Sequence, residues 1–381
     1  MSIYLDHAAT TPIDARVVAR MADVMASVHG NPSSTHNPGR IARGLVETAR
    51  DDLAALIAGQ SGQIVFTSGA TEADNLALFG LMRGAPAEQR HLVTSRIEHR
   101  AILDAARQLE AEGVRVTYVD ADREGRVPVS AVEAAIGPQT WAVSVMWVNN
   151  ETGVIQDVMA MAAICRARGV IFHSDAAQAL GHLPIRLCDT GIDLASLSAH
   201  KMGGPAGVGA LWVGARAAPL LKPILFGGGQ EHGWRPGTLP LHQIVGLGEA
   251  SRIAAEQLAQ DIAHYQAMTE LLAARLSTLP SVQRNGPAEL RAPHILNLAF
   301  GGVDGEALHA SLPGLAISGG SACGAERGEP SYVLRSLGRD DPAAEASIRF
   351  SVGRQTTEND IELAAKIVEN AVKKLRSLWS D

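Results

Sequence analysis

Strand-like and helix-like segments alternate along the first two thirds of the chain, and this alternation restricts the possible folds more than any other feature. Short runs rich in β-branched and aromatic residues occupy residues 63–67, 91–95, 114–119, 141–147, 170–173 and 207–213. Apolar residues recur at helical spacing in segments that begin near residues 75, 99, 129 and 159. Repeated units of this kind predict a mostly parallel sheet with helices on both faces. We therefore expect an α/β fold.

The pattern changes after a long helical stretch that runs from residue 242 towards residue 276. Strands are expected at 294–300, 315–317 and 347–352, with a helix from residue 306, a helix over 331–337 and a last helix from residue 358. This mixture predicts a second, smaller α+β domain whose boundary with the first lies inside the long helix. We expect a large domain over residues 16–255, and a small domain formed by residues 1–15 together with 256–381.

Several polar residues come just after a predicted strand, and these are the candidates for a functional site. Ligands of open α/β sheets bind at the carboxyl ends of the strands. One crevice could therefore hold all of these side chains, which are Thr71, His99, Asn150, Asp175 and Lys201.

Lys201 stands where a catalytic lysine would be expected. It follows the apolar run 193–197 and precedes a turn at residues 203–205. A lysine amine forms a Schiff base with an aldehyde cofactor, and pyridoxal phosphate also needs an acidic partner for its ring nitrogen, a role that Asp175 could fill. The alternative is an ordinary exposed lysine. Neighbouring polar residues favour the catalytic interpretation: Gln178, Ser198 and His200.

Residues 67–72, with the sequence Thr-Ser-Gly-Ala-Thr-Glu, join a predicted strand to a predicted helix. A small-residue turn at a helix start offers free backbone N–H groups and the positive end of the helix dipole to an anion. This segment is a candidate phosphate site. The alternative is a plain N-cap, which Ser or Thr usually forms before a helix.

Composition excludes several classes of function. A hydrophobic share of 46% and a charged share of 19% are those of an ordinary globular protein. The formal net charge of −7 gives no electrostatic reason to expect direct nucleic-acid binding. No apolar stretch is long enough to span a bilayer and no signal peptide is visible, so we expect a cytoplasmic enzyme. Cys165, Cys188 and Cys323 show no metal-ligand spacing, and no metal site is expected.

Six short motifs together resemble one known family, the cysteine desulfurases, which are class V, fold type I pyridoxal-phosphate enzymes. The resemblance runs from the first residues to the last strand. The motifs lie at residues 4–11 (Tyr-Leu-Asp-His-Ala-Ala-Thr-Thr), 66–72, 148–153 (Val-Asn-Asn-Glu-Thr-Gly), 173–178 (His-Ser-Asp-Ala-Ala-Gln), 198–201 (Ser-Ala-His-Lys) and 321–323 (Ser-Ala-Cys). Within the family, residues 323–335 resemble the branch that serves iron–sulfur cluster assembly and tRNA thiolation.

The resemblance implies pyridoxal 5′-phosphate as cofactor and gives each candidate a role. Lys201 would carry the Schiff base and move the Cα proton, and Asp175 would keep the ring nitrogen protonated. Gln178 would bond the ring hydroxyl, and His99 would stack on the ring and assist proton transfers. Asn150 would also contact the cofactor. The phosphate would be held by Ala70, Thr71, Ser198 and His200, with Thr238 reaching across from a second subunit, so a homodimer is expected.

For the substrate, the resemblance implies that Asn150 and Arg349 hold the α-carboxylate of L-cysteine; a structural ion pair is the alternative role of Arg349. Cys323 would attack the substrate sulfur and become a persulfide, releasing L-alanine. It lies in a stretch of small residues, 318–325, where burial of an inert thiol is not expected. Arg327 would favour its thiolate. The persulfide sulfur would pass to an acceptor protein for iron–sulfur cluster assembly, or for tRNA or DNA thio-modification.

Some residues depart from the family's pattern and keep alternatives open. Gly324 and Ala325 follow the cysteine where Thr-Ser is common, and His232 stands where arginine is usual. Pro236 is also found in selenocysteine lyases, which makes that activity the closest alternative. An aminotransferase would have no need of Cys323. A sulfur-relay or scaffold subunit without catalysis would tend to lose Lys201 or Cys323.

Overall fold

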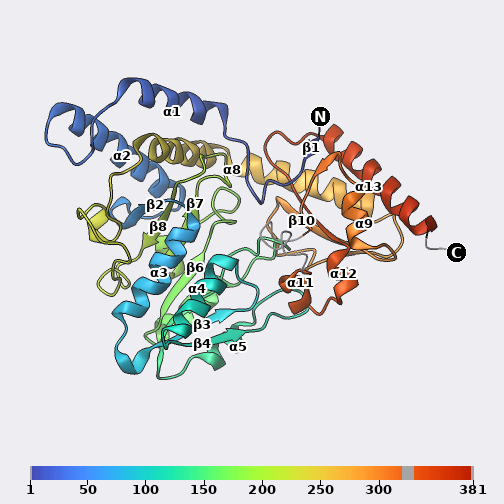
Figure 1. Ribbon diagram of the computed structural model, residues 1–381, viewed down its shortest axis with the longest axis horizontal. Helices are drawn as coiled ribbons and strands as arrows, with labels where there is room; N and C mark the ends of the chain where they lie inside the picture. The colour runs from blue at the N-terminus through green and yellow to red at the C-terminus, as the bar shows by residue number, and fades with distance from the viewer. Residues whose placement is uncertain (1, 320–329, 379–381) are drawn as a thin grey trace.

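The computed structural model describes residues 2–319 and 330–378. Its largest sheet has seven strands in the order β2-β8-β7-β6-β5-β3-β4 (Figure 1). β8 runs antiparallel to both of its neighbours, and the other neighbouring strands are parallel, as the sequence predicts. The strands are β2 (Ile64–Thr67), β3 (His91–Ser95), β4 (Arg115–Val119), β5 (Thr140–Ser144), β6 (Ile171–Asp175), β7 (Leu194–Ser198) and β8 (Gly209–Val213).

Helices cover both faces of this sheet, because successive side chains along each strand point to opposite faces. In β2, Ile64 and Phe66 pack in one cluster with the helices α2 (Asn37–Leu56), α6 (Val158–Ala167) and the first half of α8 (Leu241–Leu276). Val65 packs in another cluster with α3 (Ala70–Gly84) and α4 (Arg100–Ala111). The expected α/β fold with two helix layers is confirmed.

A second group of elements surrounds a smaller antiparallel sheet, ordered β12-β10-β9. Its hydrophobic core also takes in Leu5 from the N-terminal arm, and β1 (Ile3–Tyr4) pairs in parallel with β11 (Leu315–Ala316). The remaining elements here are β9 (Val282–Arg284), β10 (Ile295–Phe300), β12 (Ser347–Ser351), α9 (Gly305–Ala310), α11 (Tyr332–Ser336), α12 (Asp341–Glu345) and α13 (Glu358–Leu378).

Helix α8 links the two groups. Ile244 and Leu247 in its first half belong to the core beneath the large sheet, and Met268 and Leu272 in its second half belong to the core beneath the small sheet. Figure 1 shows α8 running from beside α1 and α2 to beside α13. The long helix predicted from residue 242 therefore spans both cores, which is where we expect the domain boundary.

Several short elements differ from the sequence expectations. Helix α1 (Ala15–Ser27) was not predicted, because only Val17 and Val24 of it are buried and its apolar spacing is thin. Helix α3 begins at Ala70 rather than near residue 75, and β5 ends at Ser144 rather than at residue 147. The short elements β9 and α12 were also missed. Five more short elements complete the described chain: α5 (Val129–Ala135), α7 (Leu187–Thr190), and the 3-10 turns η1 (Ser61–Gln63), η2 (Ala87–Gln89) and η3 (Glu231–Gly233).

No helix within residues 2–319 and 330–378 is long and apolar enough to cross a membrane.

Candidate active site

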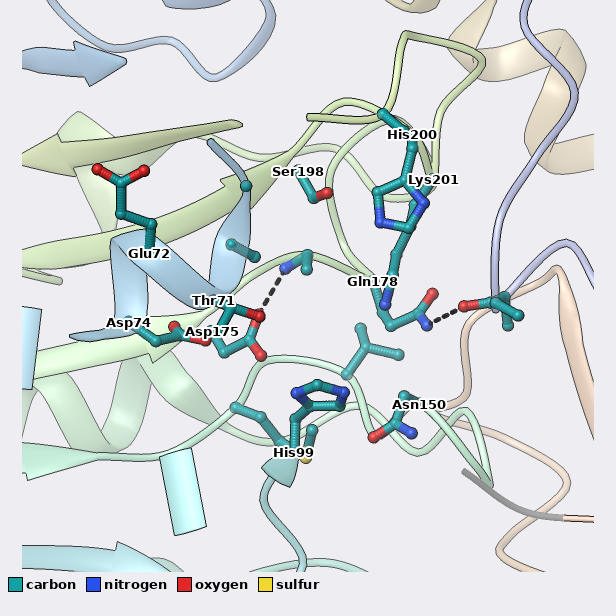
Figure 2. Close-up of a pocket in the computed structure, with 18 of the residues that line it drawn as sticks. Thr71, Glu72, Asp74, His99, Asn150, Asp175, Gln178, Ser198, His200 and Lys201 are labelled. Atoms are coloured by element: carbon teal, nitrogen blue, oxygen red, sulfur yellow. Dashed lines mark hydrogen bonds between the residues drawn. The ribbon is translucent and has the colours of Figure 1, made fainter. Parts of the chain in front are cut away.

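A cavity of about 400 Å³ opens at the carboxyl ends of the large sheet's strands (Figure 2). It brings together most of the candidate residues from separate loops. Those that line it are Ala70, Thr71, His99, Asn150, Asp175, Gln178, Ser198, His200, Lys201 and Arg349. Ser68 and Glu72 of the candidate phosphate segment 67–72 also line it, as do residues for which the sequence predicts no role: Ala8, Asp74, Met146 and Val208.

Lys201 reaches the cavity from the turn that follows β7. The backbone N–H groups of Met202 and Gly204 both donate to the carbonyl of Ala199, at 3.1 and 3.0 Å, which closes a tight turn. A Cβ on Gly204 would lie 2.9 Å from Ala199, so the turn needs glycine there. Figure 2 shows the side chains of Lys201, Gln178, Asp175 and His99 directed towards one space.

The start of α3 forms one wall of the cavity. Its N-cap, Gly69, has a φ of 155° and provides no side-chain cap, so the alternative of a Ser or Thr N-cap does not apply. The first backbone N–H groups of a helix have no partner within it and favour an anion. Close packing shapes this wall, because a Cβ on Gly209 would lie 2.7 Å from the Cα of Gly69. Ser198 and His200 stand beside it, which gives the site hydroxyl and imidazole groups as well.

Glu72 in the first turn of α3 would oppose an anion, but its charge is paired. Arg235 Nε donates to Glu72 Oε1 at 2.8 Å, and the backbone N–H of Ser68 donates to Oε2 at 2.6 Å. Figure 2 shows the Glu72 carboxylate turned away from the space between Lys201 and Asp175. The N-terminus of α3 is therefore left to a ligand in the cavity.

Asp175 is the last residue of β6 and is buried. Its Oδ1 accepts a hydrogen bond of 2.9 Å from the backbone N–H of Ala177, which fixes the carboxylate at the cavity wall. A buried carboxylate opposite a lysine amine is the pair of groups that a pyridine ring with an aldehyde substituent requires.

His99 is the N-cap of α4, and its Nδ1 accepts from the backbone N–H of Ala101 at 3.2 Å. Nδ1 therefore carries no proton, and a neutral ring has its N–H at Nε2. Burial lowers the pKa of His99, and the charge of Lys201 lowers it further, against the opposing effect of Asp175. His99 is a neutral donor at physiological pH.

Three buried polar groups that the sequence did not indicate lie at the cavity wall or directly behind it. Asp74, Glu98 and His173 are fully buried. Burial and the nearby carboxylate of Asp175 raise the pKa of Asp74 well above its ordinary value. His173 bonds Ser144 at 2.8 Å and Ser196 at 3.0 Å, and burial lowers its pKa to about 4. The only sequence signal for these groups was a set of polar residues inside apolar strands and helices.

Glu98→Gln is expected to change the pH dependence of stability. Burial raises the pKa of Glu98 from 4.5 to about 8. Between these values the unfolded chain is ionised at this position and the folded chain is not, so the wild type loses stability as pH rises, whereas glutamine does not titrate. From pH 5 to pH 8, the stability of the variant relative to wild type should rise by about 2–4 kcal/mol. Urea unfolding at both pH values measures this, and a difference that stays constant with pH would contradict it.

Arg349 forms an ion pair and also lines the cavity. It is buried, Nη2 pairs with Asp6 at 2.6 Å, and Nη1 donates to the Asn150 carbonyl at 2.8 Å. The structural ion pair therefore exists. Arg349 also lines the cavity, where neither its Nε nor Asn150 Oδ1 has a hydrogen-bond partner among the described residues.

Thr238 does not line the cavity of its own chain and is exposed. The segment that leads to it is anchored by a buried ion pair. Arg50 Nη2 lies 2.8 Å from Glu231 Oε1, and Glu231 Oε2 accepts from the backbone N–H of Phe66 at 2.7 Å. Glu231 adopts a φ of 49°, and its contacts hold it in that conformation.

Glu231→Gln is expected to destabilise the fold by about 3 kcal/mol, because it leaves the charge of Arg50 buried without a full partner. Arg50 keeps its contacts with Glu47 and the Ile64 carbonyl. The matched control is Glu256→Gln, which breaks an exposed pair with Arg252 and should cost less than about 1 kcal/mol. Thermal unfolding compares the two variants. Equal losses of stability in the two variants would show that the buried pair contributes no more than the exposed one.

Cys323 and Arg327 lie outside the described residues. The residues just before that segment lie next to the cavity wall. The backbone N–H of Arg349, which lines the cavity, donates to the Ser318 carbonyl at 2.7 Å. Just after the segment, the Ser331 hydroxyl donates a hydrogen bond to the buried Glu151.

The donor set of the cavity fits a phosphorylated aldehyde. A lysine amine, a buried carboxylate and an uncapped helix N-terminus share one space of suitable size for a small cofactor. Among the described residues, no cluster of His, Cys, Asp or Glu could hold a metal ion.

The chain is similar to known proteins over nearly its whole length. The family described as Aminotransferase class-V matches residues 3–363. The protein named cysteine desulfurase IscS from Neisseria meningitidis serogroup C (strain 053442) is 47% identical over 377 residues, covering 99% of this chain and 93% of the relative.

Two solved structures are similar throughout. A structure titled NifS-like protein has a TM-score of 0.91 and 32% identity, covering 98% of this chain and all of that one. A structure titled SspA in complex with cysteine has a TM-score of 0.84 and 34% identity, covering 93% of this chain and all of that one.

Proposed function

The chain belongs to the class-V aminotransferase family and is a cysteine desulfurase, a pyridoxal-phosphate-dependent enzyme, and from this premise we propose that the cavity around Lys201 is its active site. One observation carries the proposal. The amine of Lys201, the buried carboxylate of Asp175 and the uncapped N-terminus of α3 line the same cavity.

The residues present would hold pyridoxal 5′-phosphate at each of its functional groups. When bound, the cofactor supplies an aldehyde carbon that takes up amino groups and a ring that accepts the electron pair left on the substrate Cα. Lys201 would hold the aldehyde carbon, Asp175 the ring nitrogen and Gln178 the ring hydroxyl, with His99 against the ring and Asn150 beside it. The phosphate would be held by the N–H groups of Ala70 and Thr71 and by Ser198 and His200.

Two side chains, Lys201 and His99, transfer protons in this proposal. Lys201 Nζ takes the proton from the substrate Cα, which is general-base catalysis by a positioned amine. His99 is neutral and its Nδ1 is engaged with Ala101, so only Nε2–H is available to the cavity. At that atom His99 can give a proton to a reacting group and take it back.

Arg349 and Asn150 would hold the α-carboxylate of L-cysteine. The substrate would share the guanidinium with Asp6, since Arg349 Nη2 is paired with that residue. The structure titled SspA in complex with cysteine supports cysteine as a ligand for a cavity of this fold.

Cys323 is the nucleophile in this proposal. Its thiolate attacks the sulfur of the bound cysteine; the Cβ–S bond breaks, an S–S bond forms, and Cβ gains a proton. One L-cysteine and the Cys323 thiol thus become one L-alanine and a Cys323 persulfide. The outer sulfur then passes to an acceptor protein, or leaves as sulfide when a small thiol reduces the persulfide.

The assembly we propose is a homodimer, in which Thr238 completes the phosphate site of the partner subunit. The exposure of Thr238 on a well-anchored segment supports this role. We also propose that residues 16–255 form a large domain and that residues 1–15 with 256–381 form a small one. A cytoplasmic location remains a prediction.

The cofactor position is tested by fixing the bound cofactor with borohydride and mapping the labelled peptide. The expected label is on the peptide that contains Lys201. A label on another lysine, or no label on a protein that turns over cysteine, would contradict the assignment.

A further inference from the structure

Gln178 is held on two sides, and only one of its amide hydrogens remains for a ligand. Its Nε2 donates to the Ala8 carbonyl at 2.8 Å, and its Oε1 lies 3.3 Å from His294 Nε2. A carbonyl only accepts, so the nitrogen of the amide must face Ala8 and the oxygen must face His294. The second N–H of Gln178, which lines the cavity, is left for the occupant.

The tautomer of His294 follows from these contacts. Since Gln178 Oε1 can only accept, His294 must carry its proton at Nε2. Its Nδ1 is buried and has no hydrogen-bond partner among the described residues. The ring of His182 stacks on it with centroids 3.7 Å apart and planes 17° apart. Burial lowers the pKa of both histidines; the charge of Arg354 lowers that of His182 further, to about 3, and His182 lowers that of His294 further, so both rings are neutral.

The hydrogen bond between these residues joins the two halves of the fold. His294 directly precedes β10 of the small sheet, and its carbonyl accepts from the backbone N–H of Val352 at 3.0 Å. Gln178 follows β6 of the large sheet. The side chain of Gln178 in the cavity is therefore held by a residue that belongs to the small sheet's part of the fold.

We propose that His294 is a positioning residue of the active site, whose Nε2–H fixes the amide of Gln178 so that the free amide N–H faces the ring hydroxyl of the cofactor. This inference rests on the proposed function, because it takes pyridoxal phosphate as the occupant of the cavity. Its physical basis is that a donor already held in place loses less freedom when it bonds a ligand.

Two polar substitutions of His294 separate positioning from packing. In His294→Gln the side-chain amide nitrogen can reach the place of Nε2, so the donor is kept. In His294→Asn the amide nitrogen reaches only the place of Nδ1, so the donor to Gln178 is lost. His91→Asn is the matched control, because His91 is buried, bonds Thr117 through Nε2, and does not line the cavity.

The measurements are the dissociation constant of pyridoxal 5′-phosphate and the visible absorption band of the bound cofactor. We expect His294→Asn to weaken cofactor binding about tenfold, as for one buried hydrogen bond, and to shift the band. His294→Gln should stay within about twofold of wild type, and His91→Asn should change neither quantity even if its melting temperature falls.

Wild-type binding and absorption in both His294 variants would overturn the inference, and so would equal losses in both. A wild type that binds no pyridoxal phosphate would instead overturn the proposed function. A double substitution with Gln178→Leu adds a further test. If His294 acts through Gln178, His294→Asn should have no further effect in that background.

Discussion

Lys201→Ala is expected to reduce alanine formation from L-cysteine by at least about 10⁴-fold, the largest effect of any single substitution in the described chain. The variant loses the amine that would hold the cofactor's aldehyde and the base that would take the Cα proton. Among the residues that the structure describes, no other lysine lines the cavity. Lys201→Arg should lose as much, because a guanidinium stays protonated and cannot serve as the base.

The control for this prediction is Lys222→Ala, which removes an exposed lysine that does not line the cavity. It should leave the rate within about twofold, as expected for a surface substitution. Alanine is measured by chromatography after incubation with L-cysteine. Activity of Lys201→Ala within tenfold of wild type would place the reaction elsewhere.

Cys323→Ala is expected to reduce sulfide release by at least about 10³-fold while the protein still binds pyridoxal phosphate, because it removes only the proposed nucleophile. Its measurement pairs sulfide release with the visible absorption of the bound cofactor. Retained cofactor with lost sulfide is the expected combination. Unchanged sulfide release would rule out Cys323 as the sulfur acceptor.

The two other cysteines serve as controls. Burial and the charge of Asp193 raise the pKa of the Cys165 thiol to about 12, so it is no thiolate at neutral pH. Cys188 is exposed, but it does not line the cavity. Cys188→Ala should therefore turn over cysteine at the wild-type rate. A loss comparable to that of Cys323→Ala would contradict the assignment.

The sheet could be predicted from the sequence because its strands are buried on both faces. Each residue of β2, β7 and β8 is buried, so β2 and β8 appear in the sequence as short apolar runs, and β7 as an apolar run interrupted by serine. Helix α1 gave a weaker signal, since most of its residues face solvent. The single antiparallel strand β8 inside a parallel sheet follows from tertiary pairing, which local pattern does not encode.

The candidate residues of the site could also be recognised from the sequence, because a polar residue that directly follows a buried strand is seldom needed for packing. Lys201 and Asp175 belong to this class. Arg349 was ambiguous in the sequence and remains so in part, since it pairs with Asp6 and lines the cavity as well.

The buried polar residues around the cavity could not be recognised from the sequence. His294 lies more than a hundred positions from Gln178 along the chain, and no local motif marks their contact. Asp74 and Glu98 look like ordinary polar residues at a helix and a turn, and only the packed structure shows that they are buried. The contacts of such groups join residues that are far apart in the chain, and a local sequence pattern does not show them.

The most direct test of the central claim is the product analysis of L-cysteine turnover by the wild type in the presence of a reducing thiol. The reaction proposed here converts each L-cysteine into one L-alanine and one sulfide, so the two products should appear in equal amounts and without pyruvate. Pyruvate and ammonia in place of alanine would mean that Cβ loses its sulfur by elimination. That result would contradict a desulfurase that works through a persulfide.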